Sequence, residues 1–541
     1  MKLIRWGMIL LLLPAVMPAQ SPESYHGLLT ARVRSGKLTP PKHLQDYVQS
    51  GKFSLGLRDA ILLTLENNSA IQIDETQIET QKFSLLGSFT AFDPSIQSTF
   101  NVNRNSSPTY SQLQVGGKVN STLITLDQSG QVSYTQTFTP GTNIVAEISS
   151  NKSSTNSSYD YFNPYYSSTL NLQFTQPLLR GAGRFANLAP VIIARRSLEQ
   201  SRASFEAEVN DAVLQVIEQY WTAVEARGAL DVQKKSLDLA QVSYERDKRS
   251  LELGALPPLD IYRSESEVAS RKVSVIQAAY TLTQAEDALR ITIGANQDPR
   301  FQSLEFDLTE KPQPSGELES VDAAAALADA LARRPEVEVV KKSLAIDDAN
   351  IRLAHNQLLP NLSFNGFYQS NGTNSQYDTK GNPIKGGGFG TSMNQAFGFG
   401  YPGYGGTLTL TLPVRNRAGQ ATLGSALVSR TRDLYTGQQT REQIIRDVND
   451  ALHQLDEAKL ALVAGAVSFD LAQKSLASDQ RKFELGAETN YFVLDSQTKL
   501  ASAELVLLET QVNYQNALAA VRHATGSLLE PYRVRIADLS K

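Results

Sequence analysis

The sequence predicts an α+β membrane protein, in which a trimeric twelve-stranded β-barrel is continued by a long α-helical barrel of coiled-coil hairpins. Three observations predict this fold. The second half of the chain repeats the first, four long helical segments carry apolar residues at steps of seven, and two stretches between the helices contain almost no charge.

Composition excludes several classes of protein. The 541 residues include 51 basic and 55 acidic side chains, so bulk charge gives no reason to expect a nucleic-acid partner. The chain has no cysteine, and its five histidines lie far apart, without the spacing that places two ligands on one helix face. No nucleophile elbow, P-loop or dinucleotide-binding fingerprint is present. We therefore expect no catalytic site, metal or cofactor.

The N-terminus is typical of an exported protein. Residues 1–19 combine Lys2 and Arg5 with a short apolar run that ends in small residues, which is the pattern of a cleaved signal peptide. A membrane anchor is the alternative, but the apolar run is shorter than the roughly 20 residues that span a bilayer as a helix. Since no later segment is continuously apolar over 18 residues, a membrane crossing requires a β-barrel. Residues 20–54 form an N-terminal extension, either wrapped on the helices or disordered.

The internal repeat divides the mature chain. A segment of nineteen residues that ends at Ala255 matches the segment that ends at Ala487 in eleven positions, an offset of 232. Because the same offset continues without a gap for about eighty residues, it predicts two copies of one unit. We assign a first repeat to 55–295, a linker to 296–320, a second repeat to 321–527 and a C-terminal tail to 528–541.

Each repeat reads as short helices, strands, and a helical hairpin. From Val191 to Leu253 there is no proline, and apolar residues follow every seventh position from Val209, which predicts a coiled-coil-like helix. The second repeat has the same pattern from Val448. Glycine stops each long helix, so the hairpin tips lie near 252–260 and 484–492. The expected short helices are 57–67 and 70–90 in the first repeat, and 321–333 and 336–359 in the second.

The stretches of low charge predict the strands. Residues 94–176 hold six charged side chains and residues 361–414 hold three, and Leu170 to Thr175 alternates apolar with polar residues. Four strands are expected, around 95–104, 168–176, 361–369 and 406–413, whereas 113–150 either adds a hairpin or extends strands and loop. A soluble β-sandwich is the alternative. Because four strands cannot close a barrel, three copies with twelve strands are expected.

Together these residues resemble the outer-membrane efflux protein family, the TolC-like channels. The resemblance rests on the two heptad hairpins with ELGA tips, the helix ends at Gly294 and Gly526, and the LTLP entry from strand to helix at Pro413. It implies a homotrimer that spans the lipid of the outer membrane and extends into the periplasm. It also implies a passive exit duct for efflux or type I secretion, docked to a periplasmic adaptor (membrane fusion) protein and an inner-membrane pump.

The resemblance also implies two sets of site residues. The tip residues Gly254, Ala255, Leu256, Gly486 and Ala487 either contact the adaptor or only end the helices. The expected periplasmic gate comprises Asp495, Phe492 and Asp260. In the second unit, some relatives carry acidic residues six and nine positions after the tip glycine. Here those positions hold Phe492 and Asp495, and the first unit has Asp260 and Arg263, so each unit has one acidic residue. The alternative for Asp495 is a solvated carboxylate paired with Lys499 at i+4.

A second class of function remains open from the sequence. A structural or adhesive periplasmic protein that uses its coiled coils as spacers would share the helical pattern. A pump adaptor is less consistent, since it would carry one hairpin and not two hairpins that are each preceded by amphipathic strands. Conductance in a planar bilayer separates a duct from a spacer. The sequence does not specify the cargo.

Overall fold

The computed structural model describes residues 40–49, 51–117, 122–253, 261–314, 316–375 and 387–533. The predicted signal peptide and four site residues, Gly254, Ala255, Leu256 and Asp260, lie outside these ranges. The chain divides into two compact units. A sheet unit comprises 82–197 and 343–432, and a helical unit comprises the described parts of 30–81, 198–342 and 433–541.

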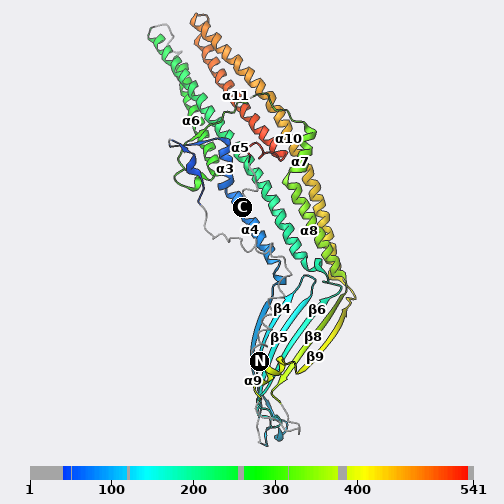
Figure 1. The fold of residues 1–541 in the computed structure, drawn as a ribbon. Helices are drawn as coiled ribbons and strands as arrows, with labels where there is room; N and C mark the ends of the chain where they lie inside the picture. Colours follow the sequence, from blue (N-terminus) through cyan, green and yellow to red (C-terminus); the bar gives the residue numbers. More distant parts are fainter. Residues whose placement is uncertain are drawn as a thin grey trace, which may run out of the picture. The chain divides into compact units, whose positions relative to one another are not determined.

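The helices of the described chain follow the predicted order (Figure 1). They are α3 (Leu57–Asn67), α4 (Ser69–Gly87), α5 (Arg184–Glu252), α6 (Ile261–Thr292), α7 (Ala323–Arg333), α8 (Pro335–Leu358), α9 (Phe389–Phe397), α10 (Arg417–Glu484) and α11 (Asn490–Ala524). The long helix of the first repeat begins at Arg184, seven residues before the expected Val191. Pro190 lies within its second turn and does not mark its start. The short helix α9 was not expected.

In the helical unit, the heptad positions face inward as predicted. Val448, Leu455 and Tyr514 are each at most 4% exposed and belong to one apolar cluster between α10 and α11. The two hairpins also touch each other, because a Cβ on Gly228 of α5 would lie 2.6 Å from Leu508 Cδ2 of α11. Glycine therefore lets these helices approach closely.

The breaks in the short helices receive the ends of the hairpins. Gly294, after α6, has φ +75°, and a Cβ there would lie 2.7 Å from Asn67 Cβ at the break between α3 and α4. Gly526, after α11, has φ +72° and packs in the same way on Arg333, at the break between α7 and α8. Left-handed φ and lack of space together explain glycine at these two positions.

The N-terminal extension and the inter-repeat linker meet in a small sheet of the helical unit. Its strands are β1 (Val48–Gln49), β2 (Lys52–Leu55) and β7 (Phe306–Leu308), and β2 pairs with β7 in parallel. Phe53 and Phe306 are each 1% exposed, and their rings lie 5.5 Å apart. The described part of the extension is thus ordered against the linker.

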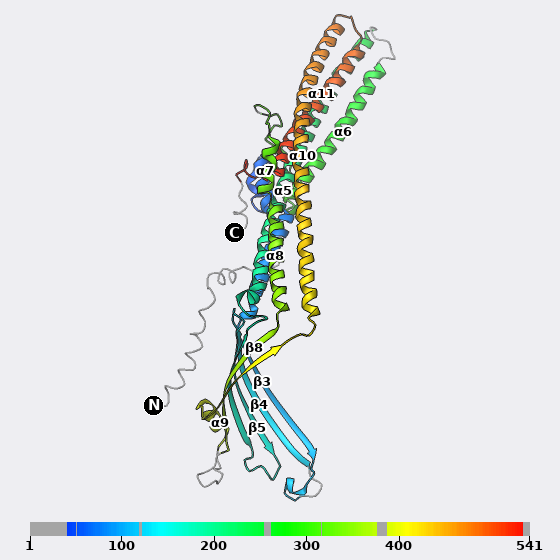
Figure 2. The ribbon, with the colours of Figure 1, turned by 90° about the vertical axis from the view of Figure 1, so that its right-hand side faces the viewer.

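Apolar stripes also lie on the outside of the helical unit. On α10, Leu460, Val463 and Val467 are 55–75% exposed, and on α6, Val273, Ile276 and Tyr280 are 54–68% exposed. Figure 2 shows α6 and α10 on opposite sides of α11. By length and composition alone, one stretch of α10 is apolar enough to cross a membrane, with mean hydropathy 1.2 and 17% of it buried. Length and composition alone do not establish a membrane span, so the expectation of no transmembrane helix stays a prediction.

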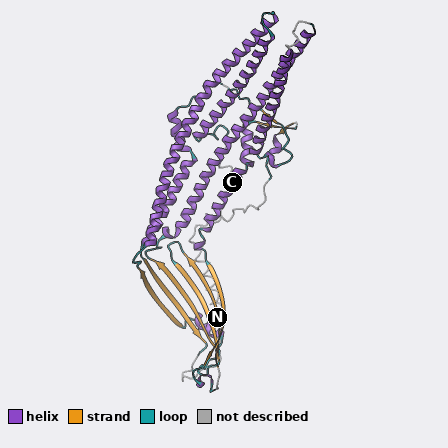
Figure 3. Ribbon diagram, turned by 180° about the vertical axis from the view of Figure 1, so that it is seen from behind, coloured by secondary structure: helices purple, strands orange, loops and turns teal. Residues whose placement is uncertain are grey.

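The sheet unit contains one antiparallel sheet of six strands (Figure 3). In spatial order they are β3 (Ser95–Pro108), β4 (Thr122–Thr137), β5 (Asn143–Thr155), β6 (Tyr165–Pro177), β8 (Asn361–Thr373) and β9 (Tyr401–Thr411). The expected four strands per chain is therefore wrong. The stretch 113–150 adds a hairpin, β4 and β5, so three chains carry eighteen strands and not twelve. Within the described residues, the outer edges of β3 and β9 pair with no other strand of this chain.

The six strands share one consistent alternation. Every register pairs even with even and odd with odd residue numbers, and paired residues of antiparallel strands share a face. We call the face of the even-numbered residues the apolar face, since it carries Ile148, Leu170, Phe174, Phe364 and Leu408. The polar face carries the odd-numbered residues, which are largely Ser, Thr, Asn and Gln.

Candidate functional site: the second hairpin tip and the polar sheet face

The tip of the second hairpin is closed by a glycine in the left-handed region. Gly486 has φ +72°, its N–H donates to Phe483 O (2.9 Å), and the N–H of Ala487 donates to Lys482 O (2.9 Å). These two bonds form a Schellman motif, which ends α10 and reverses the chain. A Cβ on Gly486 would meet nothing within 4 Å, so conformation and not space selects glycine here.

Charged groups brace the outside of this tip. Lys482 Nζ lies 2.8 Å from Glu488 Oε1 and 3.3 Å from Asp479 Oδ1. Across the hairpin, Ser496 Oγ donates to Asp479 Oδ2 (2.5 Å). The hydrogen bond from Ser496 and the nearby Lys482 hold the pKa of Asp479 below its usual value. The carboxylate of Asp479 therefore fastens α10 to α11 near the tip.

The first hairpin has the same bond at the equivalent positions. Ser264 Oγ on α6 donates to Asp247 Oδ2 on α5, and both residues precede their partners above by 232 positions. Asp247 is 5% exposed, so its carboxylate depends on these internal donors. The sequence analysis missed this network, although Asp247 and Asp479 are among the identical positions of the repeat.

Asn490 is one of the residues that join the two hairpins near their tips. Asn490 Nδ2 donates to Asp247 Oδ2 (2.7 Å), and Asn490 Oδ1 accepts from Arg246 Nη2 (2.5 Å). Arg246 also lies over the ring of Phe483, 4.5 Å from its centroid. The first turn of α11 is thus bound to α5 by hydrogen bonds that include two charged groups.

The predicted gate residues Phe492 and Asp495 lie on one exposed ridge of α11. Phe492 is 47% exposed, whereas the following Val493 and Leu494 are buried. Asp495 Oδ2 lies 2.7 Å from Lys499 Nζ, and the side chain of Asp495 is 39% exposed. This hydrogen-bonded pair raises the pKa of Lys499. The carboxylate is therefore partnered within its own helix, as the alternative interpretation expected, and it also remains open to solvent.

A second feature relevant to transport is the polar face of the sheet. In the described strands of the six-stranded sheet, four residues are charged: Arg104 and Lys152 on the apolar face, and Asp127 and Glu147 on the polar face. An amphipathic sheet with acidic groups on its hydrated side is suited to line a passage for water and cations. Sequence alternation indicated two such faces for Leu170 to Thr175 but did not extend to β4 and β5.

Comparison with known proteins identifies the family to which this chain is similar. A family model described as outer membrane efflux protein matches residues 90–295 and 326–527. The probable efflux pump outer membrane protein TtgC of Pseudomonas putida is 22% identical over 331 residues, which are 60% of this chain and 62% of that protein. Outer membrane protein TolC of Vibrio cholerae is 22% identical over 62% of this chain and 72% of its own length. The chain thus spans less than two thirds of the length of TtgC.

Solved structures share the fold. The Campylobacter jejuni CmeC outer membrane channel is similar with a TM-score of 0.60 at 15% identity, over 95% of this chain and 94% of that one. The open state of the Neisseria gonorrhoeae MtrE outer membrane channel gives a TM-score of 0.61 at 17% identity, over 92% and 99%. At these identities the likeness concerns the fold alone.

Proposed function

The chain belongs to the outer membrane efflux protein family, and from this premise we propose that it is the passive exit duct of a tripartite efflux or type I secretion system. The duct would cross the outer membrane through its sheet unit and extend into the periplasm through its helical unit. The observation that carries the proposal is the six-stranded sheet, which has an apolar face, a polar face and two unpaired edges.

Those edges call for assembly with further copies. In an antiparallel sheet with an even number of strands, β9 of one copy runs opposite to β3 of the next, so the two edges can pair and a ring can close. Closure turns the apolar faces outward to lipid and the polar faces inward to water. TtgC is named as an outer membrane protein of an efflux pump, which agrees with this arrangement.

We propose that the ring is a homotrimer with eighteen strands. At a strand spacing of about 4.8 Å and a tilt of about 40°, eighteen strands give a barrel with a backbone diameter of roughly 36 Å, against roughly 24 Å for twelve. Barrels of 16 to 18 strands are wide enough to hold an aqueous channel. The exposed stripes on α6 and α10 support the same assembly, since each could be buried against the neighbouring copy.

A place at the end of an efflux pathway requires partner proteins in the periplasm and the inner membrane. The tip of the second hairpin, with Gly486 and Ala487, would face a periplasmic adaptor that connects the duct to an inner-membrane pump. The exposed ridge of Phe492 and Asp495 would narrow the periplasmic mouth, where three copies of the carboxylate would meet around the axis. Asp260 and the first tip, which the sequence predicts to share this role, lie outside the described residues.

Two measurements test the proposal. Purified protein in a planar bilayer should conduct ions, whereas a coiled-coil spacer should not. The mass of the purified particle, after the mass of bound detergent is subtracted, should be three times that of one chain without its signal peptide. One chain of 541 residues, signal peptide included, has a mass of 59.2 kDa. Twice that mass with a closed barrel would replace the trimer with a twelve-stranded dimer. Lack of conductance, even after the tip contacts are loosened by Asn490→Ala, would favour the spacer.

A further inference from the structure

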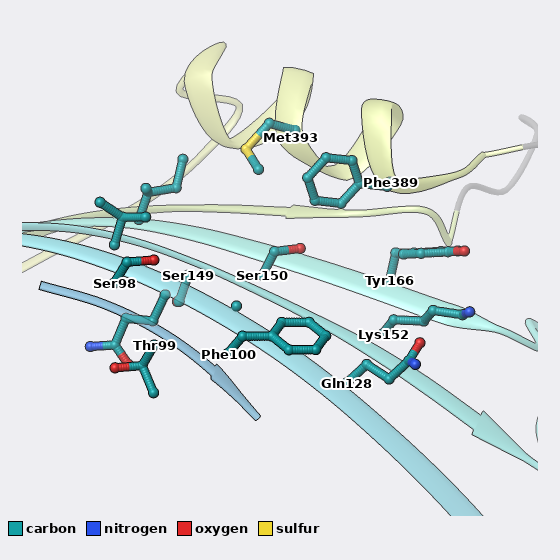
Figure 4. A pocket seen from close by; sticks show the side chains of 14 residues that line it. Ser98, Thr99, Phe100, Gln128, Ser149, Ser150, Lys152, Tyr166, Phe389 and Met393 are labelled. Atoms are coloured by element: carbon teal, nitrogen blue, oxygen red, sulfur yellow. The ribbon is translucent and has the colours of Figure 1, made fainter. Parts of the chain in front are cut away.

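The apolar face of the sheet carries a groove beside α9 that a simple duct does not require. The groove has a volume of about 420 Å³ and lies between α9 and strands β3 to β6, all within the sheet unit (Figure 4). Phe100, Val132 and Ile148 line the groove from the sheet. Figure 4 shows Phe389 and Met393 of α9 across the groove from Phe100. One end of the groove is polar, with Gln128, Lys152 and Tyr166.

The helix is held tightly on this face. Ser392 Oγ lies 2.9 Å from Ser168 Oγ, and Gln395 Oε1 accepts from Thr373 N (2.9 Å). A Cβ on Gly372 would lie 1.9 Å from Ser392 O, so only glycine lets the helix rest on the backbone of β8. Because Ser392 and Ala396 are fully buried, α9 is a fixed wall of the groove.

Charge on the sheet is segregated by face. The two basic residues in the strands of the six-stranded sheet, Arg104 and Lys152, lie on the apolar face, and that face carries no acidic residue within the same strands. On β5, Lys152 follows Ile148 by four residues, or about 13 Å, toward the end of the sheet that does not lead into the long helices. Arg104 and Lys152 therefore lie toward the end of the sheet that is distant from the long helices, and the next residues of the same face on their strands are Ser106 and Ser154.

We propose that the groove binds an anionic, phosphate-bearing lipid of the outer leaflet. An acyl chain would fill the space between Phe100, Ile148 and Met393, and the phosphate would lie against Lys152 and Arg104. A cation on a lipid-facing surface is unfavourable near the membrane centre and is best placed at the level of the anionic headgroups. The proposal rests on the proposed function, because it requires the apolar face to contact lipid.

Competitive lipid retention tests this assignment. Protein is reconstituted in nanodiscs of equal parts dimyristoyl phosphatidylglycerol and dimyristoyl phosphatidylcholine, and the lipid retained after detergent extraction is measured by native mass spectrometry. We expect the wild type to retain the anionic lipid, and the Lys152→Gln/Arg104→Gln variant to retain it about tenfold less. Met393→Ala should lower retention of both lipids.

The matched control is Arg415→Gln, which removes an exposed basic residue between β9 and α10 and should change nothing. Conductance of each preparation serves as a separate readout and should be equal in the wild type and the double variant. Normal conductance with unchanged lipid retention in the double variant would overturn the lipid site alone. So would displacement of the lipid by 10 mM inorganic phosphate, since the site would then bind a free anion. A wild type that does not conduct would instead reject the duct.

Discussion

Asn490→Ala should loosen the two hairpins from each other at their tips. The side chain of Asn490 accepts a hydrogen bond from Arg246 and donates one to Asp247, and alanine removes both. Asp247 is 5% exposed and would keep the hydrogen bond from Ser264 and a long ion pair, 4.0 Å, with Arg246 Nε. The variant therefore separates the contact between hairpins from the contact within the first hairpin.

The expected size of the effect follows from these two bonds. A hydrogen bond to a charged group contributes about 1.5–3 kcal/mol when it is shielded from water, which applies to the buried Asp247. The side chain of Arg246 is 43% exposed, so its bond adds little. We expect a loss of about 2 kcal/mol in the free energy that holds the tips together, which is about a 30-fold change in the population of separated tips.

Amide hydrogen exchange measures this population directly. Exchange of residues 486–492 should be about 30-fold faster in Asn490→Ala than in the wild type, while exchange in the strands stays the same. Bilayer conductance should rise, since the tips would separate more often. Ser496→Ala is the matched control, because it breaks a bond within one hairpin and leaves the link between hairpins. Equal exchange of residues 486–492 in Asn490→Ala and the wild type would refute the reasoning.

Four further outcomes are expected. Gly486→Ala should destabilise the α10–α11 turn by about 1 kcal/mol because of its φ of +72°, with Gly486→Asn closer to the wild type, as checked by thermal melting. Because the pKa of Asp479 is lowered in the folded state, the tip should be stable at neutral pH and lose stability as the pH falls below about 4. Between pH 7 and pH 3, the melting temperature should fall less in Asp479→Asn than in the wild type. Tyr220→Phe should lower the free energy of unfolding of the helical unit by about 1–2 kcal/mol, because the buried hydroxyl donates a hydrogen bond to Leu55 O. Burial raises the pKa of this hydroxyl to about 12, and chemical denaturation measures the loss. Asp495→Ala should weaken block of channel current by divalent cations without lowering the melting temperature, and unaltered block would remove the gate role.

Local signals in the sequence predicted most of the helical unit. The bounds of α3 at Leu57–Asn67 match the prediction, and those of α7 at Ala323–Arg333 differ by two residues at one end. Glycine or proline at the helix breaks and apolar residues at steps of seven are features of adjacent sequence. They therefore need no knowledge of distant contacts.

Two parts of the sheet unit were harder to predict. Strands β4 and β5 consist largely of Ser, Thr, Asn and Gln, so their alternation is weak, and their pairing depends on register with β3 and β6. Helix α9 lies in a glycine- and aromatic-rich stretch that reads as loop. It forms where Ser392 and Ala396 pack on the sheet, which is a tertiary effect.

The candidate site was predicted only in part, because some of its contacts also depend on tertiary packing. Glycine at 486 indicated the tip, and the tip indicated Phe492 and Asp495. The bonds of Asp247 and Asp479 depend on how far one helix is shifted along its neighbour, which apolar spacing alone does not determine. Asn490 has no counterpart in the first repeat, where Pro258 stands at the equivalent position, so comparison of the repeats gave no signal for it.

The two unpaired edges of the sheet also bear on the life of the chain before it assembles. Within the part of the chain that the structure describes, a single copy presents the outer edges of β3, fourteen residues long, and β9, eleven residues long, without a partner strand. Two chains that pair through one edge each would still have one edge apiece left over, so in the proposed trimer growth would continue until the third copy closes the ring or a fourth extends an open polymer. Closure is an intramolecular step, whereas polymer growth accelerates with chain concentration. The yield of finished channels should therefore pass through a maximum as the rate of synthesis rises.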